Sequence, residues 1–170
     1  MKLTKLIFLF ILSVVVISCS KDDDNDTSYD YNKDNLTGTY KLISYQSQEV
    51  ETVNVSGFDV VTTTTSTGDT FDVTAVFASN NTVTLDGSYR VTETVTQGNQ
   101  STTDAYIVVL SNETSGYVVN AATTELTIDG STYKVSNFSS TGFQINLSET
   151  TTQPNGDNTV YTEEFVFTKQ

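Results

Sequence analysis

The 170-residue sequence predicts an all-β fold, on the strength of three observations. Thr occurs 31 times and Val 20 times, and both residue types favour extended backbone. Apolar and polar residues alternate with a period of two over much of the chain after residue 36. Turn-forming residues interrupt these runs at spacings typical of antiparallel barrels and sandwiches. We therefore expect one up-and-down antiparallel barrel of about eight to ten strands over residues 36–170, with a β-sandwich as the alternative.

The first 18 residues have the features of a secretory signal peptide. Lys2 and Lys5 form a short basic start, and residues 6–17 (LIFLFILSVVVI) form an apolar run. A helix over this run would span about 18 Å, whereas the hydrocarbon core of a membrane is about 30 Å thick. The run is therefore typical of a cleaved signal and too short for a membrane span.

The apolar run ends in Val16-Ile17-Ser18-Cys19, and Cys19 is the only cysteine of the chain. This pattern resembles the lipobox of bacterial lipoproteins, in which the cysteine is acylated after the signal peptide is removed. The next residues, 20–26 (SKDDDND), resemble the Ser-Lys-Asp-Asp export tag of surface lipoproteins of Bacteroidota. The resemblance implies attachment to the outer membrane through acylated Cys19, on the cell surface or, as the alternative, facing the periplasm.

Residues 19–35 are expected to form an acidic, disordered tether between this anchor and the folded domain. Repulsion between like charges keeps such a segment extended. Removing residues 1–18 takes away two of the 8 basic residues and none of the 21 acidic ones, so the net charge changes from -13 to -15. Anionic lipid headgroups repel this charge, so the acyl chains would have to hold the protein at the membrane.

The expected strands follow one another between turn signals. The turn signals lie at residues 66–69, 80–81, 86–87, 98–99, 115–116, 129–130, 141–142 and 154–157. Alternation between them predicts which side chains face the interior: Phe71, Val73, Phe77, Tyr89, Val91, Tyr106, Val108, Tyr133, Phe143, Ile145, Phe165 and Phe167. Each of these is either an ordinary core residue or a contact for a ligand. The Thr-rich run at residues 60–65 predicts an ordinary solvated strand, with a flat strand suited to pairing at a sheet edge as the alternative.

Several short segments resemble the lipocalin-like lipoproteins of Bacteroidota. Residues 35–42 (NLTGTYKL) are similar to the family's opening Leu-x-Gly-x-Trp-Lys-Leu strand, and residues 77–89 are similar to its Phe-containing hairpin. Residues 116–149 and 164–169 are similar to its closing strands. Tyr40 and Tyr117 stand where the family often has Trp. The resemblance covers about residues 36–170 and implies a small barrel that can hold a small apolar ligand.

The composition argues against catalysis. The chain has no His, so it lacks an imidazole base and the usual zinc and haem ligands, and its single Cys forms no metal cluster. Paired carboxylates can hydrolyse glycosides, but Glu163 and Glu164 are adjacent, so their side chains point to opposite faces of a strand and cannot share a site. Glu49 and Glu51 share a face, but carboxylates on one exposed edge are usually solvated. With eight basic residues the chain also lacks the phosphate-neutralising charge of nucleic-acid-binding proteins. We expect no enzymatic activity, no cofactor and no nucleic-acid partner.

Three functions remain compatible with the sequence. The barrel interior could hold a small hydrophobic ligand. Exposed tyrosines could form a surface glycan-binding or adhesion module, for which Tyr29, Tyr31, Tyr45 and Tyr161 are the candidates. The domain could instead be an accessory subunit of an outer-membrane protein complex, which would require a large apolar patch on its exterior.

Overall fold

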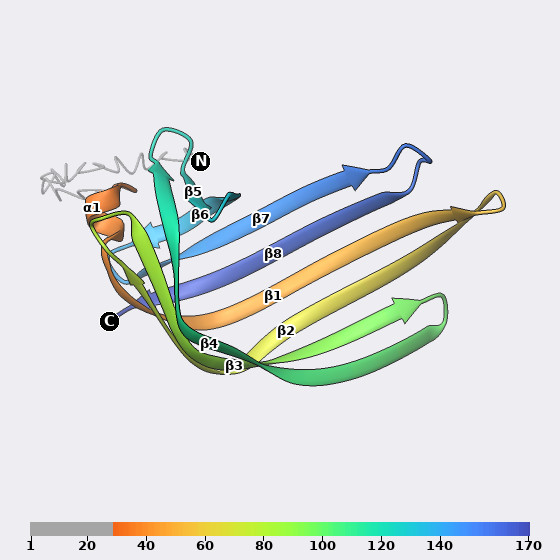
Figure 1. Cartoon of the computed structure of the whole chain (residues 1–170), viewed down its shortest axis with the longest axis horizontal. Coiled ribbons are helices and arrows are strands. Elements are labelled where there is room, and N and C mark those ends of the chain that lie inside the picture. Colours follow the sequence, from red (N-terminus) through yellow and green to blue (C-terminus); the bar gives the residue numbers. More distant parts are fainter. Residues whose placement is uncertain (1–28) are drawn as a thin grey trace, which may run out of the picture.

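A computed structural model describes residues 29–170, and eight antiparallel strands there close into one barrel (Figure 1). The elements are α1 Lys33–Leu36, β1 Gly38–Val55, β2 Phe58–Phe77, β3 Thr82–Gln97, β4 Gln100–Asn120, β5 Glu125–Ile128, β6 Ser131–Ser139, β7 Gly142–Thr152 and β8 Asn158–Lys169. Each strand pairs with the next, and β8 returns to pair with β1. The predicted all-β, up-and-down barrel is confirmed. The signal peptide (residues 1–18), Cys19 and the tether up to residue 28 lie outside the described residues.

Two tyrosines fill the closed end of the barrel. Tyr40 and Tyr117 are 1% and 2% exposed. The Tyr40 hydroxyl donates to the carbonyl of Leu36 at 2.9 Å, and the Tyr117 hydroxyl donates to the carbonyl of Ala78 at 2.8 Å. Phe77 packs edge-on against both rings, at centroid distances of 5.8 and 5.4 Å. The two rings therefore bury large apolar surfaces while their hydroxyls stay hydrogen-bonded, as a buried Tyr requires.

The folded part begins earlier than the predicted boundary at residue 36. Leu36 of α1 is completely buried. The Tyr31 hydroxyl donates to the carbonyl of Glu125 at 2.9 Å, and the Tyr29 ring stacks on Phe138 at 5.3 Å. Residues 29–35 therefore cover the closed end and are not part of a free tether. All the described elements and the core cluster belong to one barrel, so we expect residues 29–170 to fold as a unit.

The barrel wall is incomplete along β4. β4 pairs with β3 from Gln100 to Gly116, but β5 pairs only with its last residues, from Tyr117 to Asn120. Across the gap, the pairing of β6 with β7 ends at Asn146. The β3–β4 and β7–β8 hairpins consequently diverge at the end away from α1 (Figure 1). The open half of the barrel is thus a curved sheet with a free edge on β4.

Three predicted turns lie inside strands. Residues 66–69 belong to β2, residues 86–87 to β3 and residues 115–116 to β4. The first two accompany irregular pairing, because the register shifts between Asp69 and Asp72 and between Leu85 and Gly87. Glycine within a strand marks a β-bulge as readily as a turn, so strands predicted as separate are continuous.

The Thr-rich run is an ordinary strand of the sheet, and the alternative of an edge strand is wrong. Residues 60–65 lie in β2, which pairs with β1 along this run and with β3 from Thr62 onward. The free edges of the sheet lie instead on β4 and on the part of β7 beyond Asn146. The missed connection is the hairpin at Ser56 and Gly57, between β1 and β2, where both residues have positive φ. The Ser-Gly pair was an available turn signal there.

Replacing Gly87 tests the irregular pairing beside it, where β2 and β4 each carry one extra residue opposite β3. Gly87 has φ of 118°, and an added Cβ would lie 1.8 Å from the carbonyl oxygen of Asp72. Gly87→Ala should therefore lower the free energy of unfolding by about 2–3 kcal/mol. Gly116→Ala is the control, because a Cβ there meets nothing within 4 Å, and it should change the free energy by less than about 1 kcal/mol. Urea denaturation gives both values, and equal stabilities would contradict the close approach of Gly87 to Asp72.

The free edge of β4 predicts self-association. Val109 lies on this edge and is 64% exposed, and neighbouring Ile107 is 59% exposed. Unprotected apolar edges add strands from other molecules, and a Lys on the edge prevents this. Val109→Lys should therefore reduce concentration-dependent association in sedimentation velocity. Val118→Lys is the matched control, because Val118 is also 64% exposed on β4 but its backbone lies where β5 covers the edge. If both substitutions reduced association equally, the added charge would explain the reduction and the open edge of β4 would not.

Candidate functional site

The inner face of the open half carries a carboxylate surrounded by tyrosines. Glu163 of β8 accepts a hydrogen bond from the Tyr161 hydroxyl at 2.9 Å and another from the Tyr133 hydroxyl at 3.4 Å. Glu163 faces inward because Phe165 and Phe167, two and four residues further along β8, pack into the core. The side chain is half-buried. We call Glu163 with Tyr45, Tyr89, Tyr106, Tyr133 and Tyr161 the tyrosine cluster.

The other tyrosines of the cluster come from β1, β3 and β4. The Tyr45 hydroxyl donates to Ser47 Oγ at 3.2 Å, and its ring lies edge-on to Tyr89 at 5.6 Å. Tyr89 stacks on Phe71 at 5.7 Å. Tyr106 is on the same inner face, opposite Val91 of β3. Aromatic rings from β1, β2, β3 and β4 thus lie around the space in front of Glu163.

The cluster holds one carboxylate among phenols that keep their protons. Burial raises the pKa of Glu163, the hydrogen bonds from Tyr161 and Tyr133 lower it, and the charge of Glu149 raises it further. Burial, followed by the charge of Glu163, raises the pKa of Tyr133 to about 12. Burial likewise raises the pKa of Tyr45. At neutral pH Tyr45 and Tyr133 are therefore neutral hydrogen-bonding groups beside an acid whose pKa is raised.

An apolar cavity of about 150 Å³ adjoins the cluster. Its lining comprises Phe77, Val83, Leu85, Glu113, Ser115, Ile128, Tyr133, Ile145, Phe165 and Phe167. Tyr133 belongs to both features, because its ring lines the cavity and its hydroxyl reaches Glu163. The lining residues of β4 stand just before the point where β4 meets β5. A cavity of about this size accommodates a benzene ring, whereas pockets for drug-sized ligands measure about 300–1,000 Å³.

Most of the predicted interior residues do face the core. Six are buried: Val73, Phe77, Val91, Phe143, Ile145 and Phe167. Four more are half-buried against the core: Phe71, Tyr89, Tyr133 and Phe165. Val108 is half-buried opposite Tyr89. Tyr106 departs from the prediction: it lies on the inner face but is 46% exposed, because no strand closes the wall beside it.

The prediction omitted three residues of the site. Tyr161 and Glu163 share the face of Phe165, so alternation along β8 was a usable signal. Alternation did not predict that Tyr45 faces inward, because a register shift between Leu42 and Ser44 reverses the alternation that begins at Tyr40. The four tyrosines considered for an exterior platform do not lie together on the exterior: Tyr29 and Tyr31 pack at the closed end, and Tyr45 and Tyr161 face the interior.

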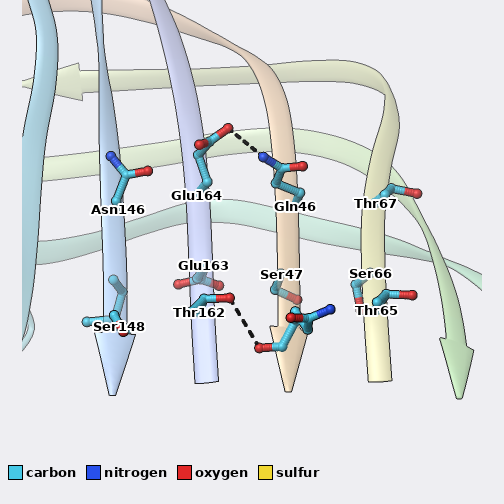
Figure 2. Close-up of a pocket in the computed structure, with 12 residues that line it drawn as sticks. Gln46, Ser47, Thr65, Ser66, Thr67, Asn146, Ser148, Thr162, Glu163 and Glu164 are labelled. Atoms are coloured by element: carbon cyan, nitrogen blue, oxygen red, sulfur yellow. Dashed lines mark hydrogen bonds between the residues drawn. The ribbon is translucent and has the colours of Figure 1, made fainter. Parts of the chain in front are cut away.

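A larger hollow of about 530 Å³ lies on the outer face of the sheet. Figure 2 shows its polar side chains across β7, β8, β1 and β2. One row runs across Asn146, Glu164, Gln46 and Thr67, and the next across Ser148, Thr162, Gln48 and Thr65.

These outer side chains largely bind one another. Glu164 accepts hydrogen bonds from Gln46 at 2.8 Å and from Gln144 at 2.6 Å. The hollow is wide open, and no aromatic ring lines it. Small-molecule sites are usually apolar concavities with a few converging polar groups. The inner cavity with the tyrosine cluster matches that description better, despite its smaller volume.

Searches of protein-family models, curated proteins and solved structures found no match to this chain. Within residues 29–170, no helix is long and apolar enough to cross a membrane. The same residues contain no group of three or more His, Cys, Asp or Glu side chains placed to hold a metal ion. The evidence for the candidate site is therefore the geometry of the inner cavity and the tyrosine cluster.

The raised pKa of Glu163 predicts a pH-dependent stability. Protonation of Glu163 favours the folded state, so its stabilisation is complete below the ordinary pKa of 4.5 and is lost as pH rises through the raised folded-state pKa. Glu163→Gln imitates the protonated acid. This variant should have a higher melting temperature than the parent at pH 8, and the difference should shrink toward pH 4.5.

The control is Glu164→Gln, which removes the same charge from the outer face of the same strand. Its difference from the parent should not follow this pH profile, which thermal unfolding between pH 4 and pH 8 would record. Parallel profiles for the parent and Glu163→Gln would show that Glu163 ionises normally.

Proposed function

We propose that this protein is a non-catalytic binding protein, held at the outer membrane by acylated Cys19, whose barrel takes up one small amphipathic molecule. The apolar end of the ligand occupies the inner cavity, and its polar end lies against the tyrosine cluster. One observation carries the proposal: Tyr133 lines the cavity with its ring and hydrogen-bonds Glu163 with its hydroxyl. A ligand in contact with Tyr133 therefore meets an apolar wall and a polar group together.

The opening in the barrel wall supports this proposal. Glu113 and Ser115 line the cavity from β4, in the part of that strand that no β5 residue covers. A ligand can enter here without breaking backbone hydrogen bonds between strands. In a fully paired barrel wall, the same passage would require β4 and β5 to separate.

The size of the cavity restricts the ligand. A buried aromatic ring removes about 150 Å² or more from water, which corresponds to about 4 kcal/mol at about 25 cal/mol per Å². Taken alone, this free energy corresponds to a dissociation constant of about 1 mM. The cavity therefore suits a single ring or a short branched chain, and contacts with the tyrosine cluster must supply any tighter binding.

A cavity-filling substitution tests the function. Ser115→Phe should place a ring in the cavity mouth and abolish binding of 2-phenylethanol to residues 29–170. Thr114→Phe is the control, because Thr114 neighbours Ser115 but faces outward, where its hydroxyl lies 2.9 Å from that of Thr84. Saturation-transfer NMR detects binding in the millimolar range. Binding to the parent and Thr114→Phe but not to Ser115→Phe supports the proposal, whereas no binding to the parent, or equal binding to all three, contradicts it.

A further inference from the structure

We propose that the ligand carries an organic cation, such as an alkylammonium group, which Glu163 holds among the aromatic rings of the tyrosine cluster. This inference rests on the proposed binding function and specifies the chemical class of the ligand. It concerns the sign of charge that the inner face accepts. Three independent observations support it.

The first observation is where the basic side chains lie. Residues 29–170 contain five: Lys33, Lys41, Arg90, Lys134 and Lys169. Three of these pair with acids of neighbouring outward positions, in the ion pairs Lys41–Asp72, Arg90–Asp69 and Lys134–Glu125. Lys33 belongs to α1, and Lys169 donates to Tyr29 and to the carbonyl of Asn35 at the closed end. Within the described part of the chain, none of these cations reaches the tyrosine cluster, so an anionic ligand would find no counter-charge there.

The second observation is that acidic residues occupy inward positions around Glu163. Glu49 of β1 and Glu149 of β7 both pair with Tyr161, whose side chain faces the interior. Glu93 of β3 pairs with the buried Ser66. Directly paired residues share a face of the sheet, so these carboxylates border the open half of the barrel. A concave surface lined with one sign of charge concentrates ions of the opposite sign.

The third observation is the aromatic surface in front of Glu163. Tyr161 and Tyr133 fix the two carboxylate oxygens by hydrogen bonds. The ring of Tyr45 lies 5.1 Å from Phe165 and 5.6 Å from Tyr89, and together these form a continuous aromatic wall. The faces of aromatic rings attract cations, most strongly where water is excluded. A carboxylate within such a wall is the arrangement that binds alkylammonium groups, whose weakly hydrated surface also contacts the rings.

The ionisation of Glu163 gives this site a characteristic pH dependence. A bound cation stabilises the ionised carboxylate, so cation affinity should rise as pH increases through the raised pKa of Glu163. The titratable groups that interact with Glu163 are Tyr45, Tyr89, Tyr133, Tyr161 and Glu149. Tyr45, Tyr89 and Tyr133 have raised pKa values and stay neutral over this range, so these tyrosines do not contribute to the rise. A neutral ligand of the same shape should lack this rise.

Three probes of matched shape test the inference on residues 29–170. They are 2-phenylethylamine, which is a cation at pH 7, the neutral 2-phenylethanol, and 3-phenylpropionate, which is an anion. We expect the cation to bind about tenfold more tightly than the alcohol, and the anion to bind more weakly than both. Glu163→Gln should lower the affinity for the cation about tenfold, and Glu164→Gln, the control on the outer face, should leave it unchanged.

The outcomes separate the inference from the proposed function. If the alcohol binds but the cation binds no more tightly, the inference fails and the binding function stands. If Glu164→Gln lowers the affinity for the cation as much as Glu163→Gln does, general charge attraction explains the preference and the inference also fails. If none of the three probes binds, the proposed function fails and the inference fails with it. A preference for the cation that depends on Glu163 and rises with pH supports both.

Discussion

The tyrosine-filled closed end is the constraint on which the rest of this barrel depends. A sheet closes only when side chains fill its interior, and here Tyr40, Phe77 and Tyr117 do so. The hydroxyl of Tyr40 binds the last residue of α1, and that of Tyr117 binds the turn between β2 and β3. The same side chains therefore fill the core and fix the covering segments. Tyr117 is also the residue at which β4 first pairs with β5.

Beyond this end, no comparable packing draws the strands together. β1 to β4 continue as long hairpins whose inner faces change from Phe and Val to Tyr, Thr and Glu. The candidate site lies at the transition, where a dry core meets a solvated concave surface. Tyr133 spans the boundary. Binding amphipathic molecules is a natural property of such a boundary, because both kinds of surface are already in place.

Glu163 and Glu164 show how one strand gives two adjacent carboxylates different properties. Glu164 faces outward and accepts hydrogen bonds from two glutamine side chains, which link neighbouring strands. Glu163 faces inward, where burial raises its pKa and two tyrosines hold its oxygens. Their difference comes from the alternation of side chains along β8. Glu163→Gln and Glu164→Gln therefore remove the same charge from opposite faces of one strand, so each variant serves as the control for the other.

The sequence by itself determined the all-β class, the order of the barrel and most of its interior, because alternation and turn chemistry are local properties of the chain. It also determined that basic residues are scarce. Only the tertiary structure decided that Gly87 lies beside bulges in β2 and β4, that Tyr45 faces inward and that β4 leaves the wall open beside Tyr106. These features depend on which distant residues pair and where the ladder shifts. Alternation along one strand carries no information about either, so the cavity and the tyrosine cluster emerge only when the strands are assembled.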